Sequence, residues 1–468
     1  MSCMSAHSGA ALILAVDIGT SSLKAAYIDQ DGKFVSGQQG IGAFTRIAYA
    51  QIASVPESAA AWEQAFALAL EKLHDLAPDV LADAVCISGN GPTLVPVAEG
   101  GRTLSPLYWY GGKKNMSGND AEQAKAPSFF LPYAAWFKEN SRDEYKKTKY
   151  FFSSHEWLAF RLGASAFTAL PSSFYEPYYW DGEQCSLYGI EMEKFPPFVK
   201  MGSIAGHVSK EAAFLFGAGK YLKSGIPIIA GGPDFITALI GTGIRTKGGV
   251  CDRAGTSEGI NVCTEKPVNF DGPGSVPQLR PQLRPQLRML PHAREGLWNI
   301  SVVIPASGRL FEEYRIKTGQ QNRRHKEILE ELIPSSAALS FPLSEGQSVL
   351  CGMAFAVRSA LETLDEAGFK VKEMRLSGGQ SKNERWNQLK ADITGVSLMV
   401  GEIPDGELAG NAVLAASALE GISIDEAVDR MIRIREVYTP GNVDFWEEKY
   451  KEKTKFITKQ PNRHDEAK

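Results

Sequence analysis

The stretch LILAVDIGTSSLKAAYIDQDGKFV, residues 12–35, decides the fold. An apolar run over 12–16 meets the turn residues Gly-Thr-Ser-Ser, a second apolar run covers 23–28, and after the turn DQDG a third strand is expected from Lys33. Antiparallel strands at this point argue against a Rossmann fold, in which a helix follows the glycine turn. The stretch predicts a β-hairpin whose tip offers hydroxyl groups and backbone amides to a ligand such as phosphate.

Length and composition narrow the class of protein. The chain has 468 residues, which exceeds one ordinary hydrophobic core and predicts two or three large domains. Hydrophobic residues make up 44% and charged residues 22%, as in an ordinary globular protein. A net charge of −4 provides no basic surface, so we expect no nucleic-acid partner.

The N-terminal segment and the cysteines indicate the cellular compartment of the protein. The N-terminal segment lacks the positive charges of a signal peptide, and no segment reaches the ~18 apolar residues of a membrane span. The six cysteines are scattered, without a Cys-x-x-Cys pair or a histidine at zinc-finger spacing. We therefore expect a reduced, cytoplasmic protein with no membrane partner and no structural metal.

A second hairpin repeats the pattern of the first. A strand, a glycine turn and an apolar helix are predicted within GIPIIAGGPDFITALIGTGI, residues 225–244. Strands over 250–254 and 258–263 then flank the turn Gly-Thr-Ser. Two such hairpins far apart in the chain predict duplicated α/β domains with a boundary near 240–246.

The other segments complete an α/β pattern. Residues 59–77 have helical spacing, residues 83–98 read as a buried strand and loop, and residues 126–163 read as two amphipathic helices around a strand or turn. The last third alternates helices and strands as parallel βαβ units, and a helix with a charged end follows Trp446. The repeat PQLRPQLRPQLR, residues 277–288, predicts an exposed loop because its prolines exclude a regular helix or a central strand.

Four turns of small residues are candidates for binding phosphate. Glycine lets the backbone approach a ligand, and hydroxyl and amide groups bind phosphate oxygens. Each turn alone is ambiguous, because a hairpin needs glycine in any case. The turns are Gly19–Ser22, Gly231–Asp234, Gly255–Ser257 and Gly378–Ser381.

The order of these turns resembles a known family. AVDIGTSSLKAAYID, IIAGGPDFITALIGTGI, RAGTSEGINV and RLSGGQSKNERWNQLKADITG resemble the successive signatures of the FGGY carbohydrate kinases, which include xylulokinases and belong to the actin-like ATPase and sugar-kinase superfamily. The resemblance runs from Leu12 to about Tyr450. It implies two actin-like (ribonuclease H-like) α/β domains with mixed sheets flanked by helices, over residues 1–242 and 243–455, and a charged tail over 456–468. An ATP cleft between the domains and a sugar held mainly by the first domain are also implied. The sequence does not decide the oligomeric state, and a homodimer is one possible assembly.

The resemblance assigns ATP and Mg²⁺ to particular residues. Asp17 would place the metal through water, and Lys24 is a phosphate ligand if its side chain does not point away from the turn. The remaining residues that would hold the nucleotide are Gly19, Thr20, Ser21 and Ser22 in the first hairpin, Gly255, Thr256 and Ser257 in the second, and Gly378, Gly379, Gln380, Ser381 and Asn383 against the adenosine.

Three aspartates are candidates for the general base that takes the proton of the acceptor hydroxyl. Asp17 is better used near the metal, and Asp252 lies inside a strand, where it could face solvent or another strand. Asp234 starts an apolar helix, whose N-terminus stabilises a carboxylate, and it matches the family's catalytic aspartate in position. We therefore predict Asp234 as the base, with a helix N-cap as its alternative role.

The acceptor side departs from the family pattern. SGNGPTLV replaces a Met-His pair, WYGGKKN lacks an expected Asp and Arg, and Pro233 and Phe235 flank Asp234 in place of glycine and asparagine. These changes remove groups that would bind polyol hydroxyls, so we expect an altered, more aromatic pocket. The predicted substrate-binding residues are Asn90, Trp109, Tyr110, Lys113, Tyr175, Asp234 and Phe235, although core packing is an alternative for each aromatic residue.

Two functions follow from these observations. The first is ATP-dependent phosphorylation of a hydroxyl group on a sugar or sugar-like small molecule. The second is a nucleotide-binding protein of the same fold that has lost phosphoryl transfer and acts as a regulatory or interaction partner. The phosphate turns and Asp234 favour the enzyme, and the altered acceptor residues favour the second function.

Overall fold

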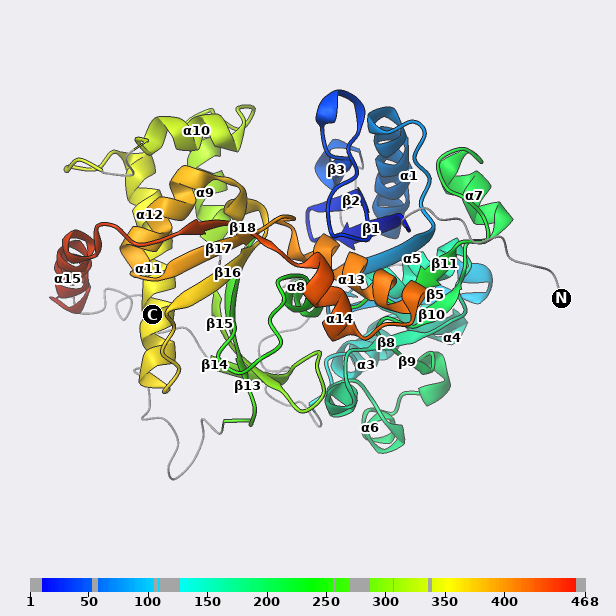
Figure 1. Ribbon diagram of the computed structural model, residues 1–468. Coiled ribbons are helices and arrows are strands. Elements are labelled where there is room, and N and C mark those ends of the chain that lie inside the picture. The colour runs from blue at the N-terminus through cyan, green and yellow to red at the C-terminus, as the bar shows by residue number, and fades with distance from the viewer. Residues whose placement is uncertain are drawn as a thin grey trace. The chain divides into compact units, whose positions relative to one another are not determined.

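The computed structural model describes residues 11–52, 58–104, 108–109, 127–255, 257–268, 287–305, 307–335 and 339–459. The chain forms two compact units (Figure 1). Unit 1 contains the chain up to Arg245, Pro291–Gly296 and Asp405–Arg433, and unit 2 contains the rest. Each unit is built on its own sheet.

The main sheet of unit 1 has six strands in the order β10-β11-β4-β1-β2-β3. Strands β1 and β2 form the predicted antiparallel hairpin, and β4 runs parallel to both β1 and β11. The strands are β1 (Ile13–Ile18), β2 (Ser22–Ile28), β3 (Phe44–Ala48), β4 (Ala84–Gly89), β10 (Ile204–His207) and β11 (Pro227–Ile229).

Helices cover both faces of this sheet. On β4, Ser88 contacts α13, and the next residue, Gly89, lies against the start of α5, so α13 and α5 lie on opposite faces. Helix α1 is on the side of α5, because Trp62 and Trp157 pack with ring centroids 5.8 Å apart. The helices of unit 1 are α1 (Ala59–Leu76), α3 (Leu131–Asn140), α4 (Arg142–Lys147), α5 (Ser154–Leu162), α6 (Gly182–Tyr188), α7 (Lys210–Gly217), α8 (Asp234–Gly241), α13 (Gly406–Glu420) and α14 (Ile424–Met431).

Two small sheets complete unit 1. One has the order β6-β5-β7, and the other pairs β8 with β9. Their strands are β5 (Thr93–Ala98), β6 (Tyr108–Trp109), β7 (Thr148–Phe152), β8 (Thr168–Leu170) and β9 (Phe198–Lys200).

Unit 2 repeats the topology of unit 1. Its seven strands have the order β14-β15-β13-β12-β16-β17-β18, in which β12 and β13 form the second hairpin and β12, β16 and β17 are parallel. The pairing directions β17-β16-β12-β13-β15 match those of β11-β4-β1-β2-β3. Its strands are β12 (Val250–Ala254), β13 (Glu258–Thr264), β14 (Leu287–Pro291), β15 (Trp298–Ile304), β16 (Glu373–Ser377), β17 (Ser397–Gly401) and β18 (Ile434–Tyr438).

The helices of unit 2 build its core. A cluster of buried aliphatic side chains lies between the sheet and α11, and a second cluster joins α11 to its neighbouring helices. The helices are α9 (Ser307–Lys317), α10 (His325–Leu332), α11 (Glu345–Glu366), α12 (Glu384–Thr394) and α15 (Val443–Lys459).

Three segments differ from the sequence prediction. The strand expected from Lys33 is wrong, because residues 33–42 make only isolated bridges around a glycine-rich turn and the third strand begins at Phe44. Where a loop was expected after β4, the chain forms the strand β5. Most of the PQLR repeat lies outside the described residues, but its last two residues start β14.

The division of the chain also differs, because Pro291–Gly296 and Asp405–Arg433 belong to unit 1. The sequence division at residue 242 puts α13 and α14 with the second domain, whereas in the structure they pack in unit 1. Helix α13 is apolar along most of its length and packs against β1 and β4, which lie far before it in the chain (Figure 1). Burial of that apolar surface explains its place in unit 1.

Candidate functional site

The tip of the first hairpin exposes the hydroxyl groups that were predicted to bind phosphate. The backbone N–H of Gly19 donates to the carbonyl of Ser22 at 3.0 Å, which closes the turn and leaves Thr20 and Ser21 exposed. Ser22 differs from them, because it is buried and its Oγ accepts a hydrogen bond from Arg46 Nε at 2.9 Å. Thr20 and Ser21 are therefore the hydroxyls available to a phosphate at this turn.

Asp17 is buried at the carboxyl end of β1 and is held from two other elements. Ser88 on β4 donates a hydrogen bond from Oγ to Asp17 Oδ1 at 3.0 Å. Asn411 on α13 donates from Nδ2 to Ser88 Oγ at 2.9 Å and to the Val16 carbonyl at 2.7 Å. Asp17 therefore has a fixed orientation, and the residues that fix it were not predicted from the sequence.

Lys24 points toward Asp17. Its Nζ lies 2.9 Å from Asp405 Oδ1, at the start of α13, and 3.8 Å from Asp17 Oδ2. Glu407 on the same helix is also 3.8 Å away. Burial lowers the pKa of the Lys24 ammonium, but the three carboxylates outweigh burial and raise the pKa above its usual value. Lys24 is therefore a permanent cation that neutralises part of this acidic cluster.

The oxygen atoms around Asp17 suit a hard metal ion that is bound through water. Carboxylate and hydroxyl oxygens are ligands that Mg²⁺ prefers, and Mg²⁺ keeps several waters. Within the described parts of the chain, no three His, Cys, Asp or Glu side chains are grouped to hold a metal directly. One oxygen of Asp17 accepts from Ser88 and the other faces Lys24, which fits contact through water better than direct ligation.

Three parallel strands of unit 1 end at predicted site residues. Strand β1 ends beside Asp17, β4 ends before Asn90, and the turn after β11 leads to Asp234. The N–H of Asn90 donates to the Ile18 carbonyl at 2.7 Å, and the N–H of Gly89 donates to the Gly232 carbonyl at 3.1 Å. In open α/β sheets ligands bind outside the carboxyl ends of the strands, and these residues share that edge.

Asp234 is the first residue of α8 and its side chain is half-buried. The N-cap position belongs to Pro233, and the Asp234 carboxylate accepts the N–H of Phe235 at 2.6 Å. The amides of the first helical turn favour the ionised carboxylate. Asp234 thus lies one position inside the helix and not at the N-cap, and its carboxylate accepts an amide of the first turn.

Asn90 is buried and anchored. Ser154, at the start of α5, donates from Oγ to Asn90 Oδ1 at 3.1 Å. The amide nitrogen of Asn90 is the end of this side chain that can donate to a ligand. Asn90 and Asp234 therefore lie at the same end of the unit 1 sheet.

The aromatic residues predicted to bind substrate differ in their exposure. Tyr175 is buried and its hydroxyl donates to the Pro291 carbonyl at 2.7 Å, which supports core packing, whereas Phe235 is half-buried beside Asp234. The backbone of Trp109 pairs with Thr93. Tyr110 and Lys113 lie outside the described residues.

The second hairpin turn is one residue shorter than the first and is also closed by a glycine N–H. The N–H of Gly255 donates to the Ser257 carbonyl at 2.9 Å, and Ser257 is exposed. Thr256 lies outside the described residues. Gln380 Nε2 donates to the Gly255 carbonyl at 3.2 Å, so the turn after β16 contacts the turn after β12.

The turn over 378–383 contains both structural and exposed residues. Gly378 has φ +99°, and a Cβ there would lie 2.4 Å from the Ala254 carbonyl oxygen. Ser381 Oγ donates to the Gly378 carbonyl at 2.7 Å, and Asn383 Oδ1 accepts the Trp386 N–H at 2.9 Å as the N-cap of α12. Gly379 is exposed and Gln380 is half-buried, and these two are available to an adenosine.

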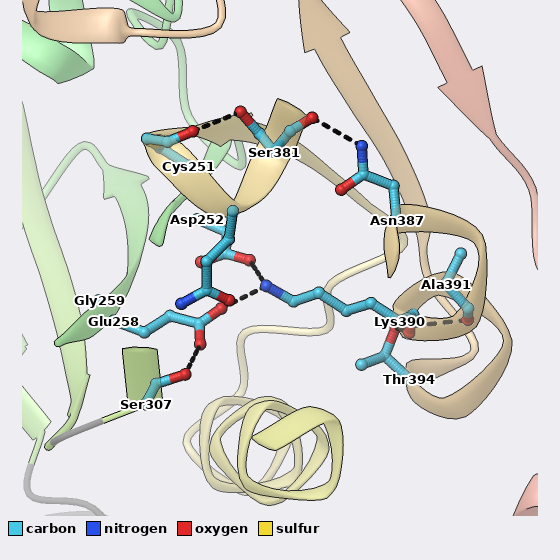
Figure 2. A network of polar contacts seen from close by, with 12 residues as sticks. Cys251, Asp252, Glu258, Gly259, Ser307, Ser381, Asn387, Lys390, Ala391 and Thr394 are labelled. Atoms are coloured by element: carbon cyan, nitrogen blue, oxygen red, sulfur yellow. Dashed lines mark hydrogen bonds and ion pairs between the residues drawn. The ribbon is translucent and has the colours of Figure 1, made fainter. Parts of the chain in front are cut away.

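A buried ionic cluster lies behind the second hairpin and was not predicted. Figure 2 shows Lys390 of α12 reaching between Asp252 of β12 and Glu258 of β13, with ion pairs to both carboxylates. Ser307 Oγ donates to Glu258 Oε2 at 2.6 Å. Burial, then Glu258, raises the pKa of Asp252 to about 7 against the opposing effect of Lys390. Of the two alternatives for Asp252, facing solvent is wrong, because the side chain is buried and shares Lys390 with Glu258 of the neighbouring strand.

Other features of the described residues bear on the sequence expectations. Five cysteines, at 86, 185, 251, 263 and 351, are free and buried. Among the helices the structure describes, none has the length and apolarity needed to cross a membrane.

Comparison with known proteins connects this geometry to a family. The model of the "FGGY family of carbohydrate kinases, N-terminal domain" matches residues 111–241, and that of the C-terminal domain matches residues 319–419. The xylulose kinase of Bacillus subtilis (strain 168) is 23% identical over 487 positions, covering 92% of each chain.

Solved structures share the fold. Gluconate kinase from Lactobacillus acidophilus superposes with a TM-score of 0.71 at 14% identity, covering 96% of this chain and 98% of the other. Glycerol kinase from Plasmodium falciparum, solved with ADP, gives 0.69 at 16% identity, covering 97% and 99%. The predicted fold of two α/β domains with mixed sheets is confirmed, and the chain belongs to the FGGY family of carbohydrate kinases.

Proposed function

We propose that this protein transfers the γ-phosphoryl group of MgATP to a hydroxyl group of a sugar or sugar-like small molecule. The main observation is that Asp17, Asn90 and Asp234 lie at or after the carboxyl ends of three adjacent parallel strands of unit 1. These side chains supply a carboxylate for metal placement, an amide for substrate binding and a carboxylate for proton transfer at one edge of the sheet.

Each group has a defined task in the proposed reaction. Asn90 donates a hydrogen bond to the acceptor, and Asp234 takes the proton of the attacking hydroxyl. The acceptor oxygen bonds to the γ-phosphorus as the bond to the β–γ bridging oxygen breaks, and ADP leaves with the electron pair. Asp17 would hold Mg²⁺ through water, and the metal would supply charge neutralisation on the phosphates.

The nucleotide is assigned to the small-residue turns. Thr20 and Ser21 contact phosphate oxygens through hydroxyl and amide groups, as does Ser257 in the second hairpin. Gly379 and Gln380 lie against the adenosine. Gly379 has no side chain, and no atom lies within 4 Å of the place that a Cβ would take. The backbone there is therefore open to close approach by a base.

A coupled assay tests this function directly. Thermal shifts of the wild-type protein are measured with MgATP and with each member of a panel of pentuloses, hexuloses, polyols and deoxy-sugars. The release of ADP that each compound stimulates is then measured. A compound that stimulates ADP release supports the kinase. Stabilisation by MgATP with no stimulation by any compound would instead support the nucleotide-binding regulator, and weak ATP hydrolysis alone would support neither.

A further inference from the structure

The buried cluster of Lys390, Asp252 and Glu258 holds both strands of the second hairpin. Glu258 directly follows Ser257, and it pairs across the hairpin with Ala254, two residues after Asp252. One carboxylate thus precedes the turn and the other follows it. The three side chains are at most 1% exposed. Lys390 therefore bridges the two strands at the base of the turn (Figure 2).

The helix that carries Lys390 also holds the turn over 378–383. Asn387, one turn of α12 before Lys390, donates from Nδ2 to the Ser381 carbonyl at 2.7 Å. Asn383 caps the same helix. Through α12, the position of the second hairpin is coupled to the position of the residues assigned to adenosine.

The two turns also touch directly. Gln380 Nε2 contacts the Gly255 carbonyl at 3.2 Å, and Gly378 packs against the backbone of Ala254. These contacts and the Lys390 cluster lie near the same end of the hairpin, because Glu258 pairs with Ala254 directly beside the turn. The turn end of the hairpin is thus held both by α12 and by the turn that precedes this helix.

Stability alone does not explain an ionic cluster in this position. Burying two carboxylates and one ammonium costs desolvation free energy, and apolar side chains of similar volume commonly stabilise a fold as well as a buried ion pair does. Charged partners differ from apolar ones because they define direction and distance. The cluster is therefore suited to fixing geometry.

We propose that Lys390 is a positioning residue of the nucleotide site. By holding Asp252 and Glu258, it sets the second phosphate turn at a fixed place relative to the adenosine turn, so that both contact one MgATP. This inference rests on the proposed function. Its consequence is selective, because the acceptor residues Asn90 and Asp234 belong to the other unit: loss of the cluster weakens MgATP binding and leaves acceptor binding unchanged.

The test replaces the whole cluster by apolar side chains. In the variant Lys390→Met/Asp252→Leu/Glu258→Met no charge is left unpaired, so the core can stay packed. MgATP affinity is measured by calorimetry, and KM is measured for MgATP and for the acceptor. We expect MgATP affinity to fall about tenfold or more, as for a misplaced binding group, with the acceptor KM nearly unchanged.

Two further variants separate positioning from stability and charge. Leu364→Ala opens a cavity in the core of unit 2 without touching either turn, and it should bind MgATP like the wild type. Asp252→Asn keeps an oxygen that accepts from Lys390, and it should also keep MgATP affinity. If the triple variant does not fold, Lys390→Met is compared with Leu364→Ala under conditions in which the two variants are folded to the same extent. Lys390→Met should then bind MgATP more weakly than Leu364→Ala.

The outcomes are distinct. Wild-type protein that does not bind MgATP would overturn the proposed function together with this inference. Wild type that binds MgATP beside a triple variant of equal affinity would overturn the inference alone. Loss of affinity in Leu364→Ala equal to that in the cluster variants would also overturn it, because stability would then explain the effect.

Discussion

The amide nitrogen of Asn411 lies 2.7 Å from the carbonyl oxygen of Val16, which precedes Asp17 in β1. The same nitrogen donates to Ser88 Oγ, which in turn donates to Asp17. A side chain from α13 therefore sets the orientation of a carboxylate near the N-terminus of the chain. The site at this edge of unit 1 depends on a contact between residues 395 positions apart.

Replacing Asn411 by alanine should destabilise unit 1 and disturb Asp17. The buried Val16 carbonyl loses its partner, which costs about 1–3 kcal/mol of unfolding free energy. Because Ser88 loses the donor that orients it, kcat should fall as well. Urea unfolding and steady-state kinetics measure both effects, with the exposed Asn322→Ala as control. Wild-type stability in Asn411→Ala would contradict the assigned hydrogen bonds.

Replacing Lys24 by methionine should destabilise the protein more strongly. The carboxylates of Asp405 and Glu407 are buried, and removal of their cation leaves uncompensated charge at a cost of about 3–5 kcal/mol. The unfolding midpoint in urea should therefore fall, and it should recover in part when Asp405→Asn is added. If the losses of stability in the two single variants simply add in the double variant, the ion pair between Lys24 and Asp405 does not explain the destabilisation.

Gly378 should not tolerate a side chain. Its φ of +99° is unfavourable for other residues, and an added Cβ would lie 2.4 Å from the Ala254 carbonyl oxygen. Gly378→Ala should lower both the melting temperature and MgATP affinity. The matched control is Gly352→Ala in α11, where an added Cβ meets no atom within 4 Å and helix propensity improves by about 1 kcal/mol. Equal effects of the two variants would argue against a strained turn.

The sequence revealed the turns of the site better than it revealed their supports. Both hairpins follow from local signals, since glycine and small hydroxyl residues interrupt apolar runs. The contact of Asn411 with Ser88 spans 323 positions, and no local pattern indicates it. Lys390 reads as a solvent-facing residue of an amphipathic helix, yet it is buried because two carboxylates from neighbouring strands compensate its charge.

Helix α13 shows the same limit for the division of the chain. Its apolar sequence predicts a buried helix, and the structure confirms that helix. Position in the chain suggests the second domain, but the surface that it covers belongs to β1 and β4. Which sheet an apolar helix covers is decided by tertiary packing, which local periodicity does not encode.

The raised pKa of Asp252, about 7, predicts a pH-dependent contribution to stability. Between about pH 4 and pH 7 the folded protein keeps a proton on this carboxyl that the unfolded chain loses, so its contribution to the free energy of unfolding falls as pH rises through this window. Asp252→Asn should lack this contribution.

Urea unfolding of wild type and Asp252→Asn at pH 5.5 and pH 8 measures it. The difference between the two proteins removes the effects of buried groups outside this cluster, whose surroundings are the same in both. Asp252→Asn should gain stability relative to wild type as pH rises. A difference that does not change with pH would contradict a raised pKa.

The most direct test of the proposed phosphoryl transfer is the rate of acceptor-stimulated ADP release by Asp234→Ala, measured beside MgATP affinity. With Asp234 as the base, the rate should fall about 10²-fold or more. MgATP affinity should stay near that of the wild type, because the turns assigned to the nucleotide are intact. A variant that releases ADP at the wild-type rate would contradict the account.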